Sequence, residues 1–181
     1  MSFDLALARV LGIEGGFGND QKDSGGATKY GITEVVARNF GYKGDMRDMP
    51  VEFARGVYRK AYWDLLSLDA VDRLSYPVAE ELFDIAVNCG PGVAAKFLQR
   101  SLNVLNREQK DYADLIPDGS IGNRTIEALG AFTAKRGTRG ITVLLRALNA
   151  LQGAHYVTLS ERRQKDEAFI YGWLLNRVVI N

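Results

Sequence analysis

Apolar residues recur every three or four positions along most of this chain, and that spacing restricts it to a mainly α fold. Between Tyr76 and Asn88, for example, Val78, Leu82 and Ile85 fall on one face of a helix. Signals for β-strands are scarce in comparison. The helical period and its plausible caps predict helices over residues 3–14, 33–41, 50–66, 76–88, 92–106, 124–132, 140–163 and 166–178.

Residues 15–32 are the exception, and we expect them to form a small β-hairpin or an irregular loop. The 181 residues are 46% hydrophobic and 25% charged, which is ordinary for a globular protein with a real core. The motif CGPG at residues 89–92 interrupts the helical pattern. Because this break is short, we predict a first part at residues 1–90 and a second, helical part at residues 91–181 packed against it.

The net charge of +1 conceals an asymmetry along the chain. Residues 1–130 contain 15 Lys or Arg against 19 Asp or Glu, and residues 131–181 contain 8 against 3, which gives −4 and +5. The basic end either binds an anionic polymer or surface, or is a solvated helix face. The first residues, interrupted by Asp4 and Arg9, resemble neither a signal peptide nor a membrane span. We therefore expect synthesis in the cytoplasm without a signal peptide, and no integral membrane segment.

A glycine-rich segment, IEGGFGNDQKDSGGATKYGIT at residues 13–33, follows the first predicted helix and carries Glu14, Asp23 and Thr28. Its glycines allow the chain to leave the helix, double back and pass close to a substrate. At the negative end of a helix and beside apolar neighbours, the pKa of Glu14 is expected to rise, so that this residue acts as a general acid. Two carboxyl groups of different pKa flanking one bond are what glycoside hydrolysis requires.

In this interpretation Asp23 lies in a wetter loop, stays ionised and orients or deprotonates a water molecule, while Thr28 hydrogen-bonds that water or a sugar hydroxyl. Asp20 competes for the role of second carboxylate, but Asn19 and Asp20 together are more typical of a turn. In the alternative interpretation, which stays open, Glu14 is only a surface residue at the end of a helix. A Glu, an Asp and a Thr within fifteen positions also occur by chance.

The chain resembles glycoside hydrolase family 108, the EGGY-type muramidases of phages and bacteria, over nearly its whole length and in the right order. The fragments that carry this resemblance are EGGFGND, DSGGATKYGIT, VYRKAYWD, ELFDIAVNCGPGVAAKFLQRSLNV, DGSIGNRTIEAL and FIYGWLLNRV. The resemblance implies a lysozyme-like catalytic part at residues 1–90 and a peptidoglycan-binding part at residues 91–181. It implies a lysozyme activity on the β-1,4 bond between N-acetylmuramic acid and N-acetylglucosamine in peptidoglycan, with no cofactor.

Carried over residue by residue, Glu14 matches the catalytic glutamate of this family. The order of Glu14, Asp23 and Thr28 also resembles the triad of phage-type lysozymes, with one residue fewer between the aspartate and the threonine. Phe17 stands where the motif usually has Tyr, and Cys89 stands where Ser is common. The resemblance further suggests a monomeric phage endolysin that reaches the cell wall through a holin-made hole; a bacterial wall-remodelling role fits almost as well.

Three further residues are candidates for substrate binding. Tyr30 either lines the glycan groove or belongs to the core. Asp84 and Asn88 lie on one helix face at positions i and i+4 and either bind sugar groups or, for Asn88, cap the helix end. We expect Trp63 and Trp173 to be core residues.

Several classes of protein are disfavoured. His155 is the single histidine and Cys89 the single cysteine, so a zinc site is not expected, and neither is a Cys–His peptidase. No phosphate-binding loop and no strong basic–aromatic pattern for nucleic acid is present in the sequence. Two rivals to the muramidase remain, a lytic transglycosylase and a non-catalytic wall-binding or phage structural module.

Overall fold

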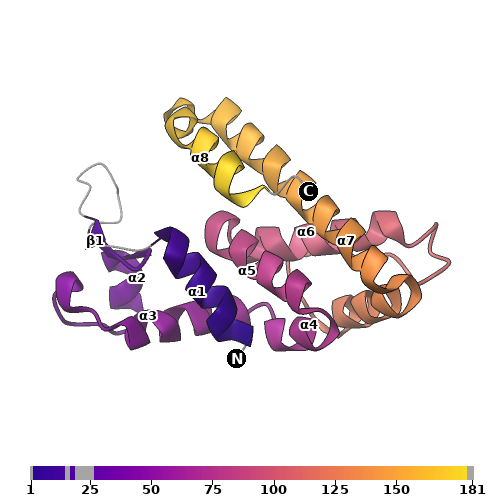
Figure 1. The fold of residues 1–181 in the computed structure, drawn as a ribbon, viewed down its shortest axis with the longest axis horizontal. Helices are drawn as coiled ribbons and strands as arrows, with labels where there is room; N and C mark the ends of the chain where they lie inside the picture. Colours follow the sequence, from indigo (N-terminus) through magenta and orange to yellow (C-terminus); the bar gives the residue numbers. More distant parts are fainter. Residues whose placement is uncertain (1, 15–16, 19–26, 179–181) are drawn as a thin grey trace. The chain divides into compact units, whose positions relative to one another are not determined.

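A computed structural model describes residues 2–14, 17–18 and 27–178 of the chain, and these residues form a mainly α structure, as predicted (Figure 1). Eight α-helices and three short helical turns account for most of the described residues. The α-helices are α1 (Ser2–Glu14), α2 (Glu34–Asn39), α3 (Val51–Tyr58), α4 (Leu68–Leu74), α5 (Tyr76–Cys89), α6 (Pro91–Leu105), α7 (Asn123–Arg162) and α8 (Glu167–Arg177). The turns are η1 (Met46–Asp48), the π-helical η2 (Arg59–Asp64) and η3 (Gln164–Asp166).

A small antiparallel sheet of three two-residue strands lies between α1 and α2 in the sequence. Its strands are β1 (Phe17–Gly18), β2 (Thr28–Lys29) and β3 (Ile32–Thr33), and their order in the sheet is β1-β2-β3. The register pairs Gly18 with Thr28 and Thr28 with Thr33. The expected β-hairpin is therefore present as β2–β3, and β1 adds a third strand to it.

The chain forms two compact units, residues 1–65 and residues 66–181. In the first unit, α1 buries Phe3, Ala6, Leu7 and Val10, which are spaced for one helix face. The ring of Phe3 meets the buried ring of Trp63 edge to face, with centroids 5.4 Å apart. The predicted core position of Trp63 is confirmed.

In the second unit, α5 packs against α4, α6 and α7. Its buried face contains Val78, Leu82 and Ile85, as the sequence predicts. The break at CGPG is also confirmed, since Gly90 has φ +95° between α5 and α6. The two compact units divide at residues 65 and 66, before α4. The sequence predicts the boundary between the two parts near residue 90, after α5.

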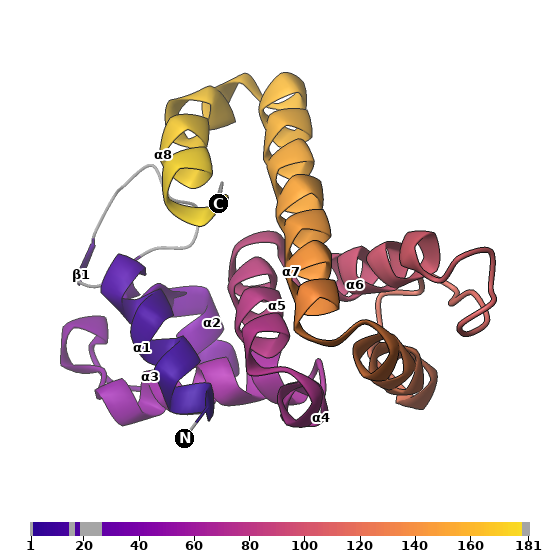
Figure 2. The same ribbon diagram turned by 45° about the vertical axis from the view of Figure 1, so that its right-hand side comes forward.

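The long helix α7 is bent at Gly137, where φ is +56° and ψ is −153° (Figure 2). This combination of angles is essentially restricted to glycine. The sequence predicts two separate helices here, at 124–132 and 140–163. The structure continues the helical pattern up to Gly137 and resumes it directly afterwards.

Two elements differ from the sequence-based expectation. Helix α4 and turn η1 lie in segments that the apolar period left unassigned. The prediction that Trp173 is a core residue is wrong, because Trp173 is only half-buried, with its ring beside those of Tyr156 and Phe169. Within the described residues, no helix is long and apolar enough to cross a membrane.

Candidate functional site

Glu14 is the last residue of α1, at the C-terminal end of the helix, as the sequence predicts. The position of α1 is fixed by its buried face and by an ion pair between Arg55 of α3 and Asp4. The Arg55 Nε donates to Asp4 Oδ1 at 2.8 Å, and Nη2 lies 2.7 Å from the same oxygen. This pair lowers the pKa of Asp4 through its hydrogen bond with the guanidinium. The side chain of Glu14 lies outside the described residues.

Only two residues separate Glu14 from β1, so its Cα lies within about 11 Å of the Cα of Phe17. Phe17 pairs with Lys29 of β2. The sheet therefore returns the chain to the neighbourhood of the helix end. Asp23 belongs to the connection between β1 and β2 and lies outside the described residues, as do the glycines at 15–16 and 25–26.

Thr28 occupies the central strand of the sheet and is half-buried. One of its pairing partners, Gly18, has no side chain, and the other, Thr33, caps α2 by accepting a hydrogen bond from the Val36 N–H at 3.4 Å. The sheet thus fixes the backbone of Thr28 from both sides.

Tyr30 and Gly31 form the two-residue turn between β2 and β3, with φ values of +52° and +71°. Positive φ at both positions is typical of a type I′ hairpin turn. A bulky residue such as tyrosine adopts this left-handed conformation at a cost of roughly 1–2 kcal/mol. The hydroxyl of Tyr58, which is 2% exposed, donates a hydrogen bond to the Tyr30 carbonyl at 2.9 Å and braces the turn from α3.

Tyr58 was not among the predicted site residues, because no local sequence pattern identifies it. Its contact with Tyr30 joins residues 28 positions apart. The ring of Tyr58 also lies against that of Tyr62, with centroids 5.7 Å apart. Burial raises the pKa of Tyr62. The half-buried Tyr30 therefore lies in an aromatic part of the first unit. This position agrees with a place in the glycan groove and equally with a place in the core.

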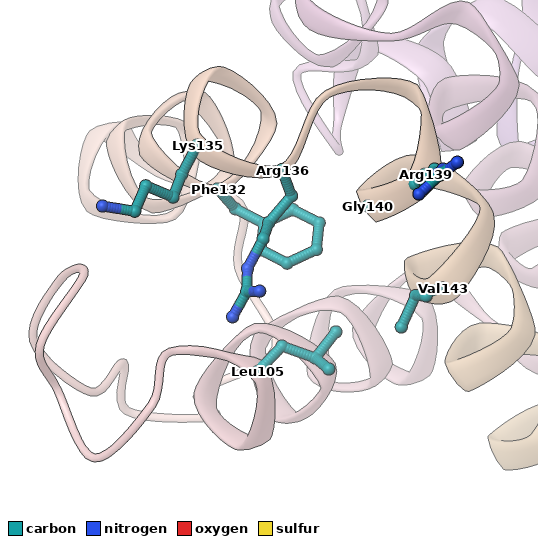
Figure 3. A pocket seen from close by; sticks show the side chains of 7 residues that line it. All are labelled: Leu105, Phe132, Lys135, Arg136, Arg139, Gly140 and Val143. Atoms are coloured by element: carbon teal, nitrogen blue, oxygen red, sulfur yellow. The ribbon is translucent and has the colours of Figure 1, made fainter.

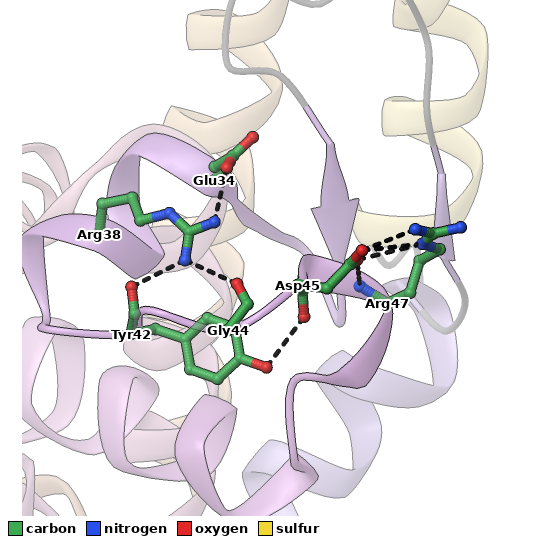
Figure 4. Close-up of polar contacts among 6 residues, drawn as sticks. All are labelled: Glu34, Arg38, Tyr42, Gly44, Asp45 and Arg47. Carbon is green, nitrogen blue, oxygen red and sulfur yellow. Dashed lines mark hydrogen bonds and ion pairs between the residues drawn. The ribbon is translucent and has the colours of Figure 1, made fainter.

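A polar network holds the segment that follows α2 (Figure 4). Arg38 donates to the carbonyls of Tyr42 and Gly44, at 2.9 and 2.7 Å, and to the Glu34 carboxylate at 2.7 Å. Arg47 binds the carboxylate of Asp45 and lowers its pKa to about 2.

Lys29 of β2 donates from Nζ to the backbone carbonyl of Arg47, which ties the sheet to this network. The ammonium group of Lys29 also lies 5.3 Å from the centroid of the Tyr30 ring. The strand that enters the hairpin turn is thus held by a contact with a distant part of the first unit.

Asp84 and Asn88 lie on α5, in the second unit. Both carboxylate oxygens of Asp84 have partners, namely Arg177 at 2.9 Å and Gln152 at 3.2 Å. Asn88 donates from Nδ2 to the backbone carbonyl of Asp84 at 2.7 Å, close to the end of the helix. Substrate binding by Asp84 and Asn88 stays a prediction.

Among the described residues, no three His, Cys, Asp or Glu side chains are clustered as a metal site requires. Burial raises the pKa of the Cys89 thiol to about 11, which leaves it protonated and a poor nucleophile at neutral pH. Burial also lowers the pKa of His155. These properties do not suit a thiol peptidase.

Two models of known protein families match the chain. The model of the family described as glycosyl hydrolase 108 matches residues 7–90, which include Glu14, Asp23 and Thr28. The N-terminal half of this chain belongs to the glycosyl hydrolase 108 family. A second family model, described as a predicted peptidoglycan domain, matches residues 93–178.

The chain as a whole is also similar to a solved structure, that of SagA from Brucella abortus. The two are 27% identical, the match covers 93% of this chain and 95% of that one, and the TM-score is 0.60. No curated protein matches the chain. Together, a glycosyl hydrolase family and a peptidoglycan domain support a peptidoglycan hydrolase.

Proposed function

We propose that this glycosyl hydrolase 108 protein is an N-acetylmuramidase that hydrolyses the β-1,4 bond between N-acetylmuramic acid and N-acetylglucosamine. The observation that carries the proposal is a glutamate at the C-terminal end of α1, followed directly by a three-stranded sheet with Thr28 in its central strand. Both lie within the residues that the glycosyl hydrolase family model matches.

Glu14 would act as the general acid. Its proton passes to the glycosidic oxygen as the bond to the anomeric carbon breaks, so that the leaving sugar departs as a neutral alcohol. For this, the carboxyl group must be protonated before reaction. The C-terminal end of a helix carries partial negative charge, which disfavours a carboxylate there.

Asp23 would take the second role, assisted by Thr28. The carboxylate accepts a proton from a water molecule while that water attacks the anomeric carbon from the opposite face, and the Thr28 hydroxyl helps to orient the water. An attack of this kind inverts the anomeric configuration and requires the two carboxyl groups to be roughly 6.5–9.5 Å apart. Tyr30, on the turn beside Thr28, is proposed to contact the glycan.

Mass spectrometry of purified peptidoglycan after digestion tests these roles. The wild type should produce reducing muramic acid ends, and Glu14→Gln should abolish them. Asp23→Asn and Thr28→Val should reduce them, Asp23→Asn more strongly. Glu52→Gln removes an exposed glutamate of the first unit and should digest like the wild type.

Two other results would contradict the muramidase proposal. Anhydro-muramic ends would identify a lytic transglycosylase, which needs no attacking water and therefore no role for Asp23. Intact glycan after treatment with the wild type would leave a non-catalytic wall-binding module.

We propose phage-mediated lysis as the biological setting, in which the protein is made in the host cytoplasm and reaches the wall after a holin opens the membrane. Co-expression with and without a holin tests this. Lysis that depends on the holin agrees with the proposal, and lysis by the hydrolase alone contradicts it.

A further inference from the structure

A cavity of about 440 Å³ lies at the bend of α7, in the second unit (Figure 3). Its lining combines a basic rim with an apolar floor. The lining residues are Leu105, Phe132, Lys135, Arg136, Arg139, Gly140 and Val143. We propose that this cavity binds a carboxylate group of the peptide stems of peptidoglycan, a ligand that rests on the proposed function of the whole chain.

Two glycines of α7 create the cavity. Gly137 takes backbone angles that other residues avoid, so that the chain bends there. Gly140 is needed because a Cβ atom at this position would lie 2.1 Å from the Cβ of Arg136. The absence of both side chains lets the two arms of α7 and the end of α6 enclose a space.

Arg136 is the cation best placed to meet a ligand. Figure 3 shows it extending from the bend past the ring of Phe132 towards Leu105, while Lys135 and Arg139 point outwards on either side. In the part of the chain that the structure describes, Lys135 and Arg139 form no ion pair within 4.0 Å. The basic rim is thus available to a negatively charged group.

The nearest acid, Asp111, pairs with Arg136 only at the limit of an ion pair and is bound more closely by another arginine. Asp111 is held by Arg107, which donates to it from Nη2 at 2.5 Å and from Nε at 3.0 Å. The guanidinium of Arg136 comes only to 4.0 Å from Asp111. The planar donors of Arg136 match a carboxylate and can bind it through two hydrogen bonds.

The floor of the cavity favours a peptide over a free inorganic anion. Phe132 is 3% exposed, and Val143, at 45%, presents apolar surface at the edge. The stems of peptidoglycan join methyl and methylene groups to free carboxylates, which matches an apolar floor beneath a basic rim. The volume lies in the range of small-ligand pockets, which is about 300–1,000 Å³.

Calorimetric titration of the full chain with the tripeptide L-Ala-γ-D-Glu-L-Lys tests the proposal. Arg136→Gln should weaken binding about tenfold or more, which is the usual effect of losing a charge-assisted hydrogen bond. Val143→Phe should also weaken it, because the larger side chain fills the cavity without changing the charge. A tripeptide with both carboxylates amidated should bind more weakly than the free acid.

Arg162→Gln is the matched control, since Arg162 is an exposed arginine of the same helix outside the lining. It should bind the tripeptide within twofold of the wild type. Circular dichroism shows whether each variant is folded. If Arg136→Gln and Val143→Phe have the spectrum of the wild type, their loss of binding is not caused by unfolding.

The proposal would be overturned if the wild type did not bind the tripeptide, or if Arg136→Gln and Val143→Phe bound it as tightly as the wild type does. It would also be overturned if the wild type preferred inorganic phosphate or phosphatidylglycerol vesicles to the tripeptide. The tripeptide contains no glycosidic bond. Its binding is therefore measured independently of glycan cleavage, and failure of the proposed muramidase activity would be recognised separately, by the absence of new reducing ends.

Discussion

The hydroxyl of Tyr58 donates a hydrogen bond to the backbone carbonyl of Tyr30, joining α3 to the turn of the β-hairpin over 2.9 Å. The turn holds Tyr30 at a φ of +52°, so this hydrogen bond stabilises a conformation that tyrosine otherwise disfavours. Because Thr28 lies two residues before Tyr30, the same contact helps to hold the proposed catalytic strand.

Tyr58→Phe removes this hydrogen bond and keeps the aromatic ring. We expect a loss of about 1–2 kcal/mol in the free energy of unfolding, since a part-buried carbonyl loses its donor. We also expect fewer reducing ends per unit time from peptidoglycan. Urea unfolding and the digestion assay measure the two effects. Tyr171→Phe, at a tyrosine that is 77% exposed, should change neither, and an unchanged Tyr58→Phe would show that the turn needs no brace.

The ion pair between Arg177 and Asp84 should contribute strongly to the stability of the second unit. The Arg177 side chain is 6% exposed, so Arg177→Leu leaves the carboxylate of Asp84, which is 20% exposed, without its cation. We expect a destabilisation of about 2–4 kcal/mol, towards the low end for a buried pair because Asp84 keeps some contact with water. Thermal or urea unfolding measures it, with Arg146→Leu as a control at a more accessible arginine of α7.

A double-mutant cycle separates this pair from the other contacts of both residues. If the pair acts as a unit, Asp84→Asn combined with Arg177→Leu costs clearly less than the sum of the single changes.

The same Asp84→Asn variant tests the predicted sugar contact. At a temperature where it is folded, a raised KM for soluble glycan supports that contact, and unchanged kinetics contradict it.

Gly137 and Gly172 should respond to alanine in opposite directions. Gly137→Ala places a Cβ at angles that alanine avoids, and we expect a loss of about 1–3 kcal/mol in unfolding free energy. Gly172 lies inside α8, and a Cβ added there would meet no atom within 4 Å, so Gly172→Ala should add about 0.5–1 kcal/mol through helix propensity. Urea midpoints of the two variants decide this. If both variants moved the urea midpoint in the same direction, the prediction that the backbone at Gly137 disfavours alanine would be wrong.

The carboxyl group of Asp45 should titrate at a pH of about 2 because of its hydrogen bonds with the Arg47 side chain and backbone. A pKa depressed by folding means that this interaction supports the fold at neutral pH and above the ordinary aspartate pKa. Its support is lost as the pH falls from about 4 towards 2. NMR titration of the Asp45 side-chain carbon measures the midpoint. Arg47→Gln should move it towards 4, and a midpoint that does not move would assign the shift to another cause.

Local sequence patterns predicted what depends on neighbouring residues. The apolar face of α5, the helix break at Gly90 and the cap of α2 at Thr33 were all predicted, because periodicity and cap chemistry act within a few positions. The end of α1 at Glu14 was predicted for the same reason. The glycine-rich composition of residues 15–32 indicated a reversal of the chain and a hairpin.

The contacts that position side chains across the fold were not predicted. Nothing near Tyr58 in the sequence indicates that it reaches Tyr30, and nothing near Asp84 indicates that Arg177 occupies its carboxylate. The exposure of Trp173 was also misjudged, since residue type favours a buried tryptophan but does not tell how much of the last helix the rest of the fold covers. Such contacts depend on the path of the whole chain.

The packing of α5 on α6 and α7 bears on how proteins of this kind can be recombined. The hydrolase family model includes α5, yet two of the helices on which α5 packs, α6 and α7, follow in the next part of the sequence. A chimera joined near residue 90 would keep α4 beside α5 but would replace α6 and α7, the other two helices on which α5 packs. A crossover near Leu65 keeps α5 with the helices it already fits, and it is the junction at which exchange of whole parts between relatives should yield folded protein.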